Sequence, residues 1–275
     1  MGEHPLPPDR LPGDPLLRGP EEAAQEPTVV EFEPSPQDMV RLADSQVVIV
    51  NGGGVEGWLQ KAVETVGGQR LVIVASDGLA GRTPREGEAV ELGGTAQGGG
   101  VDPHFWLDPL SVVRYVENIR DGLSQADPGG KQSYAKNADA YIARLKELDG
   151  WIRQQVAQVP AQRRMLVTNH ESLGYFADRY GFRIVGTIIP STSSEASPSA
   201  QQLARLIDVI QATHAPAIFL ETGANPQMAS QVAQETGVKV VTDLYTHSVT
   251  PPGGGAPTYL DMMKYDTLAI VNALK

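Results

Sequence analysis

The chain contains 275 residues, no cysteine, and 33 acidic against 22 basic side chains, so its formal net charge is −11 at pH 7. This acidic balance argues against nucleic-acid binding, which needs a basic surface. The absence of cysteine excludes disulfides, thiolate ligands and cysteine nucleophiles. Histidine, aspartate and glutamate are therefore the strong metal ligands available, and the chain contains five histidines. We find no apolar run of about 18 residues, so we predict no membrane-spanning segment.

Residues 1–27 differ from the rest of the chain because they contain seven of its 21 prolines and no strand-like apolar run. This composition predicts a disordered or extended Pro-rich tail over residues 1–27. The tail has no basic start followed by an apolar stretch, which is the pattern of a signal peptide. The sequence therefore predicts no export signal in this segment.

From about residue 28, short β-branched runs alternate with helical patterns. The predicted strands are 46–50, 71–75, 165–168, 183–189, 217–220 and 239–241. The predicted helices include 36–43, 55–66, 109–125 and 198–213. Four predicted helix starts combine a capping residue with a proline: Ser35-Pro36, Asp108-Pro109, Ser197-Pro198 and Asn225-Pro226. The alternation predicts an α/β fold with parallel sheets flanked by helices.

Residues 131–159 form a polar segment without internal proline whose apolar positions recur at steps of three, four or seven. This periodicity predicts one long helix. Because the segment lies between two α/β regions, we predict two Rossmann-like lobes joined by one long rigid helix. The expected boundaries are 28–130 for the N-terminal lobe, 131–159 for the linking helix and 160–275 for the C-terminal lobe.

A glycine motif follows the first predicted strand. Gly52, Gly54 and Gly57 satisfy the G-x-G-x-x-G pattern between a strand and a helix, and Asp77 lies where a ribose-binding acid would be expected. One hypothesis is therefore a nucleotide-binding Rossmann-type enzyme that uses Gly52–Gly57. The alternative is that the glycines permit a tight turn, and the bulky Trp58 beside the motif favours this interpretation.

Three histidines lie in loops beside predicted strands or helices. His104 precedes the helix at 109–125, and His170 and His247 each follow a strand. Ligands bind beyond the carboxyl ends of strands in open α/β sheets, so these residues are candidate metal ligands. Taken alone, each of them fits a hydrogen-bonded loop histidine better than a metal ligand.

Several motifs between residues 32 and 275 resemble those of the zinc/manganese-type solute-binding proteins of ABC transporters, a family related to bacterial adhesin lipoproteins. The most specific are Pro-His-Phe-Trp-Leu-Asp-Pro at 103–109 and Asn-His-Glu at 169–171. Further matching segments are 32–36, 51–59, 194–198, 219–222 and 259–265. The family has an Asn-Gly-x-Gly-x-Glu turn at the place of the glycine motif, without a dinucleotide.

The resemblance implies two lobes with a metal held between them by four side chains. His104 and His170 match two family ligands, and His247 occupies a position that is usually aspartate. The first ligand, usually histidine, corresponds to Val30. The remaining one, histidine or glutamate in the family, falls near residues 188–189 and has no counterpart.

Nearby carboxylates are expected to support or replace ligands. Glu31 and Glu33 lie beside the missing first ligand, and Glu221 is expected to orient a ligand rather than to bind the metal. Three imidazoles suit Zn²⁺ with a carboxylate or water as fourth ligand. A set poorer in carboxylate than the usual one is less suited to Mn²⁺, and Mn²⁺ or another divalent transition metal is the alternative to Zn²⁺.

The resemblance therefore implies a solute-binding component that captures a divalent transition metal, most favourably Zn²⁺, and delivers it to an ABC transporter permease. We expect a monomer with no catalytic residues, located in the periplasm or at the extracellular surface, although the sequence shows neither a signal peptide nor a lipidation cysteine. The alternatives are the nucleotide-binding enzyme and a metal-free adhesion or interaction protein of the same fold.

Overall fold

The computed structural model describes residues 34–82, 101–189 and 198–275. The tail predicted at residues 1–27, together with Val30, Glu31 and Glu33, lies outside the described residues. The helices are α1 (Pro36–Asp44), α2 (Leu59–Val66), α3 (Pro109–Ala126), α4 (Lys131–Val156), α5 (Gly174–Tyr180), α6 (Ala200–Thr213), α7 (Gln227–Thr236) and α8 (Tyr259–Leu274). The strands are β1 (Val47–Val50), β2 (Leu71–Val74), β3 (Met165–Thr168), β4 (Arg183–Thr187), β5 (Ala217–Glu221) and β6 (Lys239–Leu244).

The larger sheet contains four parallel strands in the order β4-β3-β5-β6. Every residue of β3 and β5 is buried, as expected for central parallel strands that helices cover on both faces. Successive β5 residues belong to different cores: Phe219 packs with α4, α5 and α8, whereas Ile218 packs with α6 and α7. This arrangement confirms the prediction of an α/β fold with parallel sheets flanked by helices.

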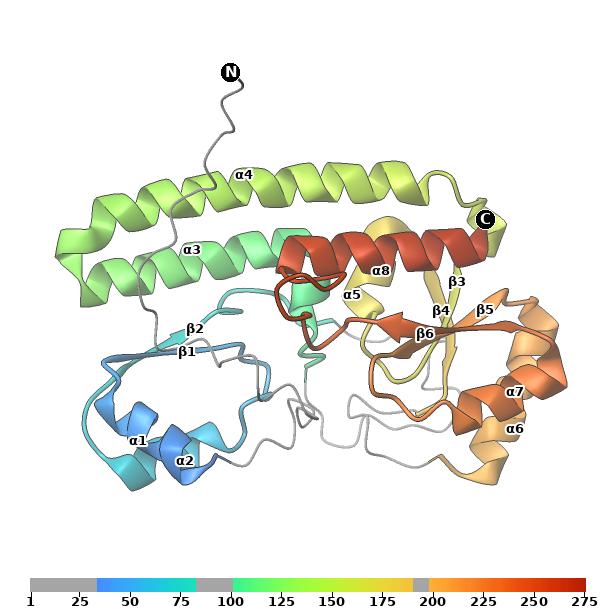
Figure 1. Ribbon diagram of the computed structural model, residues 1–275, viewed down its shortest axis with the longest axis horizontal. Coiled ribbons are helices and arrows are strands. Elements are labelled where there is room, and N and C mark those ends of the chain that lie inside the picture. Colours follow the sequence, from blue (N-terminus) through green and yellow to red (C-terminus); the bar gives the residue numbers. More distant parts are fainter. Residues whose placement is uncertain (1–33, 83–100, 190–197) are drawn as a thin grey trace, which may run out of the picture.

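The smaller sheet pairs β1 with β2 in parallel, from Val47 opposite Leu71 to Val50 opposite Val74. In Figure 1, α1 and α2 lie below this sheet and α3 lies above it. Helix α3 approaches β2 closely at Gly122, where a Cβ atom would lie only 2.3 Å from the side chain of Ile73. The sheet is therefore held between helices, as the larger one is.

Helices α3 and α4 lie side by side along one edge of the molecule, and α8 continues this helical layer over the larger sheet (Figure 1). The periodicity of α4 is confirmed, because its buried positions are Ala138, Leu145, Leu148, Ile152 and Val156. The helix ends at Val156 rather than at residue 159. Within the described part of the chain, no helix is both long and apolar enough to cross a membrane.

The helix starts follow the predicted capping residues in part. Ser35 forms a capping box at α1, and the Asp108 side chain accepts the N–H of Leu110 at α3. Helix α6 is capped by Ser199, and Ser197 lies outside the described residues. Helix α7 starts at Gln227, whose N–H is still accepted by the side chain of Asn225.

Candidate metal centre

The three candidate histidines come from one edge of the larger sheet and from the segment that precedes α3. His170 follows β3 and His247 follows β6, while β5 lies between these two strands and ends at Glu221. The carboxyl ends of parallel strands meet at one edge, so the sheet order brings Glu221 between the two histidines. His104 immediately precedes the short 3-10 helix η2 (Phe105–Leu107) and reaches the same place from the other half of the chain.

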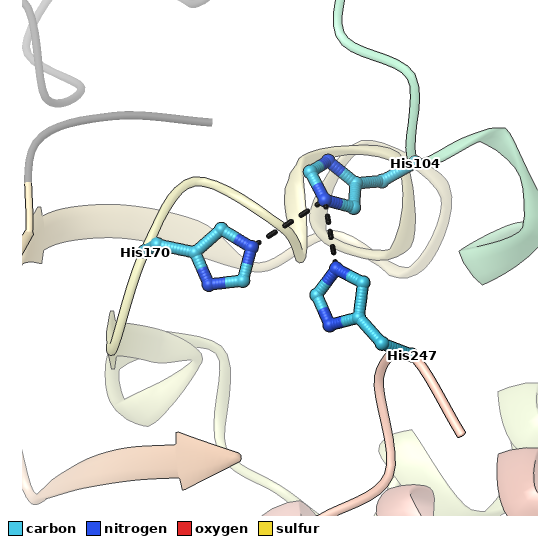
Figure 2. A group of neighbouring side chains, drawn as sticks. All are labelled: His104, His170 and His247. Carbon is cyan, nitrogen blue, oxygen red and sulfur yellow. Dashed lines mark hydrogen bonds between the residues drawn. The ribbon is translucent and has the colours of Figure 1, made fainter. Parts of the chain in front are cut away.

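The imidazole Nε2 atoms converge (Figure 2). His104 Nε2 lies 3.2 Å from His247 Nε2 and 3.4 Å from His170 Nε2. One potential ligand atom from each of the three lies within 4.8 Å of those of the other two. Two nitrogens bound to one Zn²⁺ at about 2.0–2.1 Å in a tetrahedral shell lie about 3.3 Å apart. The observed spacing therefore matches that of ligands to a single ion.

Carboxylates contact the opposite nitrogens of two of these rings. Asp102 Oδ1 lies 2.8 Å from His104 Nδ1 and also accepts the backbone N–H of His104 at 3.0 Å. Glu221 Oε1 lies 2.9 Å from His170 Nδ1, at an angle outside that of a hydrogen bond, and accepts the hydroxyl of Ser172. A carboxylate beside Nδ1 favours the proton there, which leaves Nε2 with a free lone pair.

Glu221 remains charged in this buried position. Burial raises the pKa of its carboxyl group, but the contacts with His170, His247 and Ser172 outweigh burial and hold the pKa below its ordinary value. A buried carboxylate next to two metal-binding imidazoles offsets part of the charge of a divalent ion. This position is compatible with the orienting role that the resemblance implies for Glu221, which stays a prediction.

His247 is held differently. Its Nδ1 lies 2.8 Å from Thr246 Oγ1 and 3.7 Å from Glu221 Oε2. Burial lowers the pKa of His247 to about 3; Glu221 opposes this shift, while the neighbouring His104 and His170 add to it. The His247 ring is therefore neutral at physiological pH. With the proton on Nδ1 in each ring, three Nε2 lone pairs face one point and repel each other unless a cation lies between them, so this arrangement suits a metal ion.

The backbone of the glycine motif binds a side chain of the same loop. The backbone N–H groups of Asn51 and Gly52 donate to the carboxylate of Glu56 at 2.6 and 3.2 Å. A bound pyrophosphate would need these same N–H donors. The carboxylate of Glu56 therefore occupies the place where the anion would bind. The turn that Glu56 closes also explains why α2 starts at Leu59 rather than at residue 55. The hypothesis of a nucleotide site at residues 52–57 is wrong.

The same glycine loop supports the segment that carries His104. The Asn51 side-chain amide donates to the carbonyl of Pro103 at 3.1 Å. A Cβ atom on Gly53, where φ is +67°, would lie 3.2 Å from Pro103 Cα. Only glycine fits both this backbone conformation and this close approach. The motif is thus a support for His104.

The remaining predicted positions contribute no ligand atom in the described residues. Ile188 and Ile189 are buried and apolar, in agreement with the absence of a family ligand there. Asp102, Trp106, Thr246 and Ser172 also contact the candidate ligands or Glu221, and the sequence patterns did not indicate them. The first of these carries a signal that could have been recognised, because an acid two residues before a histidine can contact its Nδ1.

The chain is similar to known metal-binding proteins over most of its length. Residues 24–273 match the family described as zinc-uptake complex component A, periplasmic. The chain is 36% identical over 244 residues to the manganese-binding lipoprotein MntA of Halalkalibacterium halodurans, which covers 89% of this chain and 77% of that protein. It is 32% identical over 244 residues to the iron-binding protein YfeA of Yersinia pestis, with coverages of 87% and 74%.

A solved structure has the same fold. The manganese-bound form of a point mutant of the periplasmic metal binding protein from Candidatus Liberibacter asiaticus superposes with a TM-score of 0.78 at 25% sequence identity. The superposition covers 90% of this chain and 88% of that chain. The similarity therefore extends over most of the fold.

Proposed function

Since the chain belongs to the zinc-uptake complex component A family of substrate-binding proteins of metal ABC transporters, we propose that it captures its metal with His104, His170 and His247. Members of this family bind substrates for transport and are not enzymes. The observation that carries the proposal is the convergence of three Nε2 atoms, two of whose separations are 3.2 and 3.4 Å.

We propose Zn²⁺ as the preferred cargo. The three converging groups are neutral imidazoles, and both neighbouring carboxylates, Asp102 and Glu221, contact Nδ1 atoms instead of pointing at the common centre. A nitrogen-rich set suits Zn²⁺ better than Mn²⁺, which prefers oxygen ligands. Two similar proteins are named for manganese and iron, so a direct competition between metals is the informative experiment.

Calorimetric titration of chelator-treated protein tests the ligand set. We expect one Zn²⁺ per chain, and His104→Ala should weaken binding by more than about a hundredfold, because losing a ligand costs more than losing its hydrogen-bonded partner. His214→Asn is the matched control: this exposed residue ends α6 with φ +54°, a conformation that asparagine tolerates. Absence of Zn²⁺ heat in the wild type, or equal affinity in His104→Ala, would overturn the ligand assignment.

The metal preference needs a second titration. Protein loaded with Mn²⁺ is mixed with one equivalent of Zn²⁺, and the released Mn²⁺ is measured by electron paramagnetic resonance. The proposal expects complete displacement. Retention of Mn²⁺ would contradict Zn²⁺ as cargo while leaving the three-histidine site in place.

The proposed role is delivery to a permease from the periplasm or the cell surface. His104 belongs to the predicted lobe at 28–130, and His170 and His247 belong to the lobe at 160–275, so one ion would join both lobes. We propose that the metal-bound form of a monomer is the form that a permease recognises. A metal-free interaction protein of the same fold would instead show no thermal shift with any divalent metal.

A further inference from the structure

Trp106 connects the two segments that carry His104 and His247. It lies in η2, two residues after His104, and its indole N–H donates to the backbone carbonyl of Thr246 at 2.7 Å. Thr246 directly precedes His247, and the two bonded residues are 140 positions apart in the chain. This hydrogen bond therefore fixes the backbone of one candidate ligand relative to the segment of another.

Thr246 passes this constraint on to the His247 ring. Thr246 is buried, with only 1% of the residue exposed, and its Oγ1 lies 2.8 Å from His247 Nδ1. The segment from residue 245 to 258 contains no helix or strand. At its first residue, the backbone N–H of Tyr245 donates to the side chain of Asp266. A ligand on such a segment needs a contact of this kind to keep its position.

The Trp106 ring is itself held in place. Its centroid lies 5.2 Å from that of His104 and 5.8 Å from that of His247, with the latter pair edge to face. The hydroxyl of Tyr259, the first residue of α8, donates to the Trp106 carbonyl at 2.8 Å. The indole therefore forms one wall beside both imidazoles and is attached to α8 as well.

We propose that Trp106 is a positioning residue for metal capture, which acts by holding His247 through the carbonyl of Thr246. This inference rests on the proposed function. Without the bond, a smaller fraction of metal-free molecules has His247 in place. The apparent dissociation constant rises as the inverse of that fraction. Loss of one buried hydrogen bond corresponds to about tenfold weaker binding.

Trp106→Phe is the informative variant, because phenylalanine keeps an aromatic ring and lacks the indole N–H. Trp151→Phe is the matched control: Trp151 lies on α4 and packs against the same core, away from the histidines. Zn²⁺ affinity is measured by competition with a chelator, and melting of the metal-free proteins is followed in parallel. We expect about tenfold weaker binding in Trp106→Phe alone, with similar melting temperatures in both variants.

The indole N–H gives a readout in the unmodified protein. The chain has three tryptophans, and the ¹⁵N-resolved indole signal that disappears in Trp106→Phe belongs to Trp106. We expect this proton to exchange slowly with D₂O and its signal to shift when Zn²⁺ is added. Trp58→Phe and Trp151→Phe assign the other two indole signals, so fast exchange of the remaining one in the wild type would overturn the proposal even if Trp106→Phe did not fold.

The possible results separate the two proposals. Wild-type protein that binds Zn²⁺, together with an equal affinity in Trp106→Phe, overturns the positioning role and leaves the proposed function intact. Equal losses in Trp106→Phe and Trp151→Phe also overturn it, because they indicate general destabilisation. Wild-type protein that binds no divalent metal overturns both.

Discussion

Replacing Glu221 by glutamine removes the charge that contacts two of the candidate ligands. Its carboxylate lies 2.9 Å from His170 Nδ1 and 3.7 Å from His247 Nδ1, and glutamine would keep the volume of the buried side chain. The negative charge of Glu221 stabilises the positive charge that a bound metal ion places on the neighbouring imidazoles. A metal-bound imidazole is a stronger N–H donor, so the contact with His170 should gain strength when the metal binds.

We therefore expect Glu221→Gln to weaken Zn²⁺ binding about 10- to 100-fold, which is the range typical for removal of an outer group that supports a metal-bound histidine. This range corresponds to about 1.4–2.7 kcal/mol. The more distant contact with His247 should add little, because 3.7 Å exceeds the length of a hydrogen bond.

The assay is competition for Zn²⁺ against a fluorescent chelator of known affinity, with chelator-treated protein near pH 7.5. Glu235→Gln, at an exposed position of α7, is the matched control and should leave the affinity unchanged. Melting of the metal-free variants shows whether the fold is intact. An unchanged affinity in a folded Glu221→Gln variant would refute the reasoning that this carboxylate orients the ligands.

Three further predictions concern stability. The pKa of His247 is near its ordinary value of 6.5 in the unfolded chain and about 3 in the folded chain. As the pH falls from 7.5 to 5, the unfolded chain therefore binds a proton that the folded chain does not, and the metal-free protein should lose about 2 kcal/mol of unfolding free energy through this residue. Urea denaturation of His247→Asn should lack that part of the loss. Gly53→Ala should lower the unfolding free energy by more than the roughly 1–2 kcal/mol cost of a positive φ, because the new Cβ would also contact Pro103, and it should weaken Zn²⁺ binding. Gly237→Ala is the control: its φ is +74° and no atom lies near its Cβ position, so it should lower the melting temperature without changing Zn²⁺ binding. Asp108→Ala should lower the unfolding free energy by about 1–2 kcal/mol through loss of the α3 cap, and an unchanged denaturation midpoint would contradict this assignment.

The local elements could be predicted because their signals are local. Strand β3 has the predicted bounds, since a short apolar run bounded by polar residues needs no information from elsewhere. The start of α2 was predicted four residues too early, because the carboxylate of Glu56 turns back to the N–H groups of residues 51 and 52. This side chain lies within the motif, but its conformation is set by the turn.

The candidate site could be predicted only in part. Residue type and position beside strand ends indicated His104, His170 and His247, and the resemblance raised them above ordinary loop histidines. The sequence could not indicate that the Nε2 atoms of His104 and His247 lie 3.2 Å apart across 143 positions of the chain. It also left the nucleotide hypothesis open, although Glu56 was visible within the motif.

The amino-acid composition determined which metal ligands are available to this protein. A chain without cysteine must build a metal centre from imidazoles and carboxylates, and its strand–helix alternation determined parallel sheets covered by helices. Only the tertiary structure decided which donors meet. The order β3-β5-β6 places Glu221 between His170 and His247, and Trp106 joins the His104 segment to Thr246. Such contacts depend on strand order and on packing between distant segments, which the periodicity of a sequence does not encode.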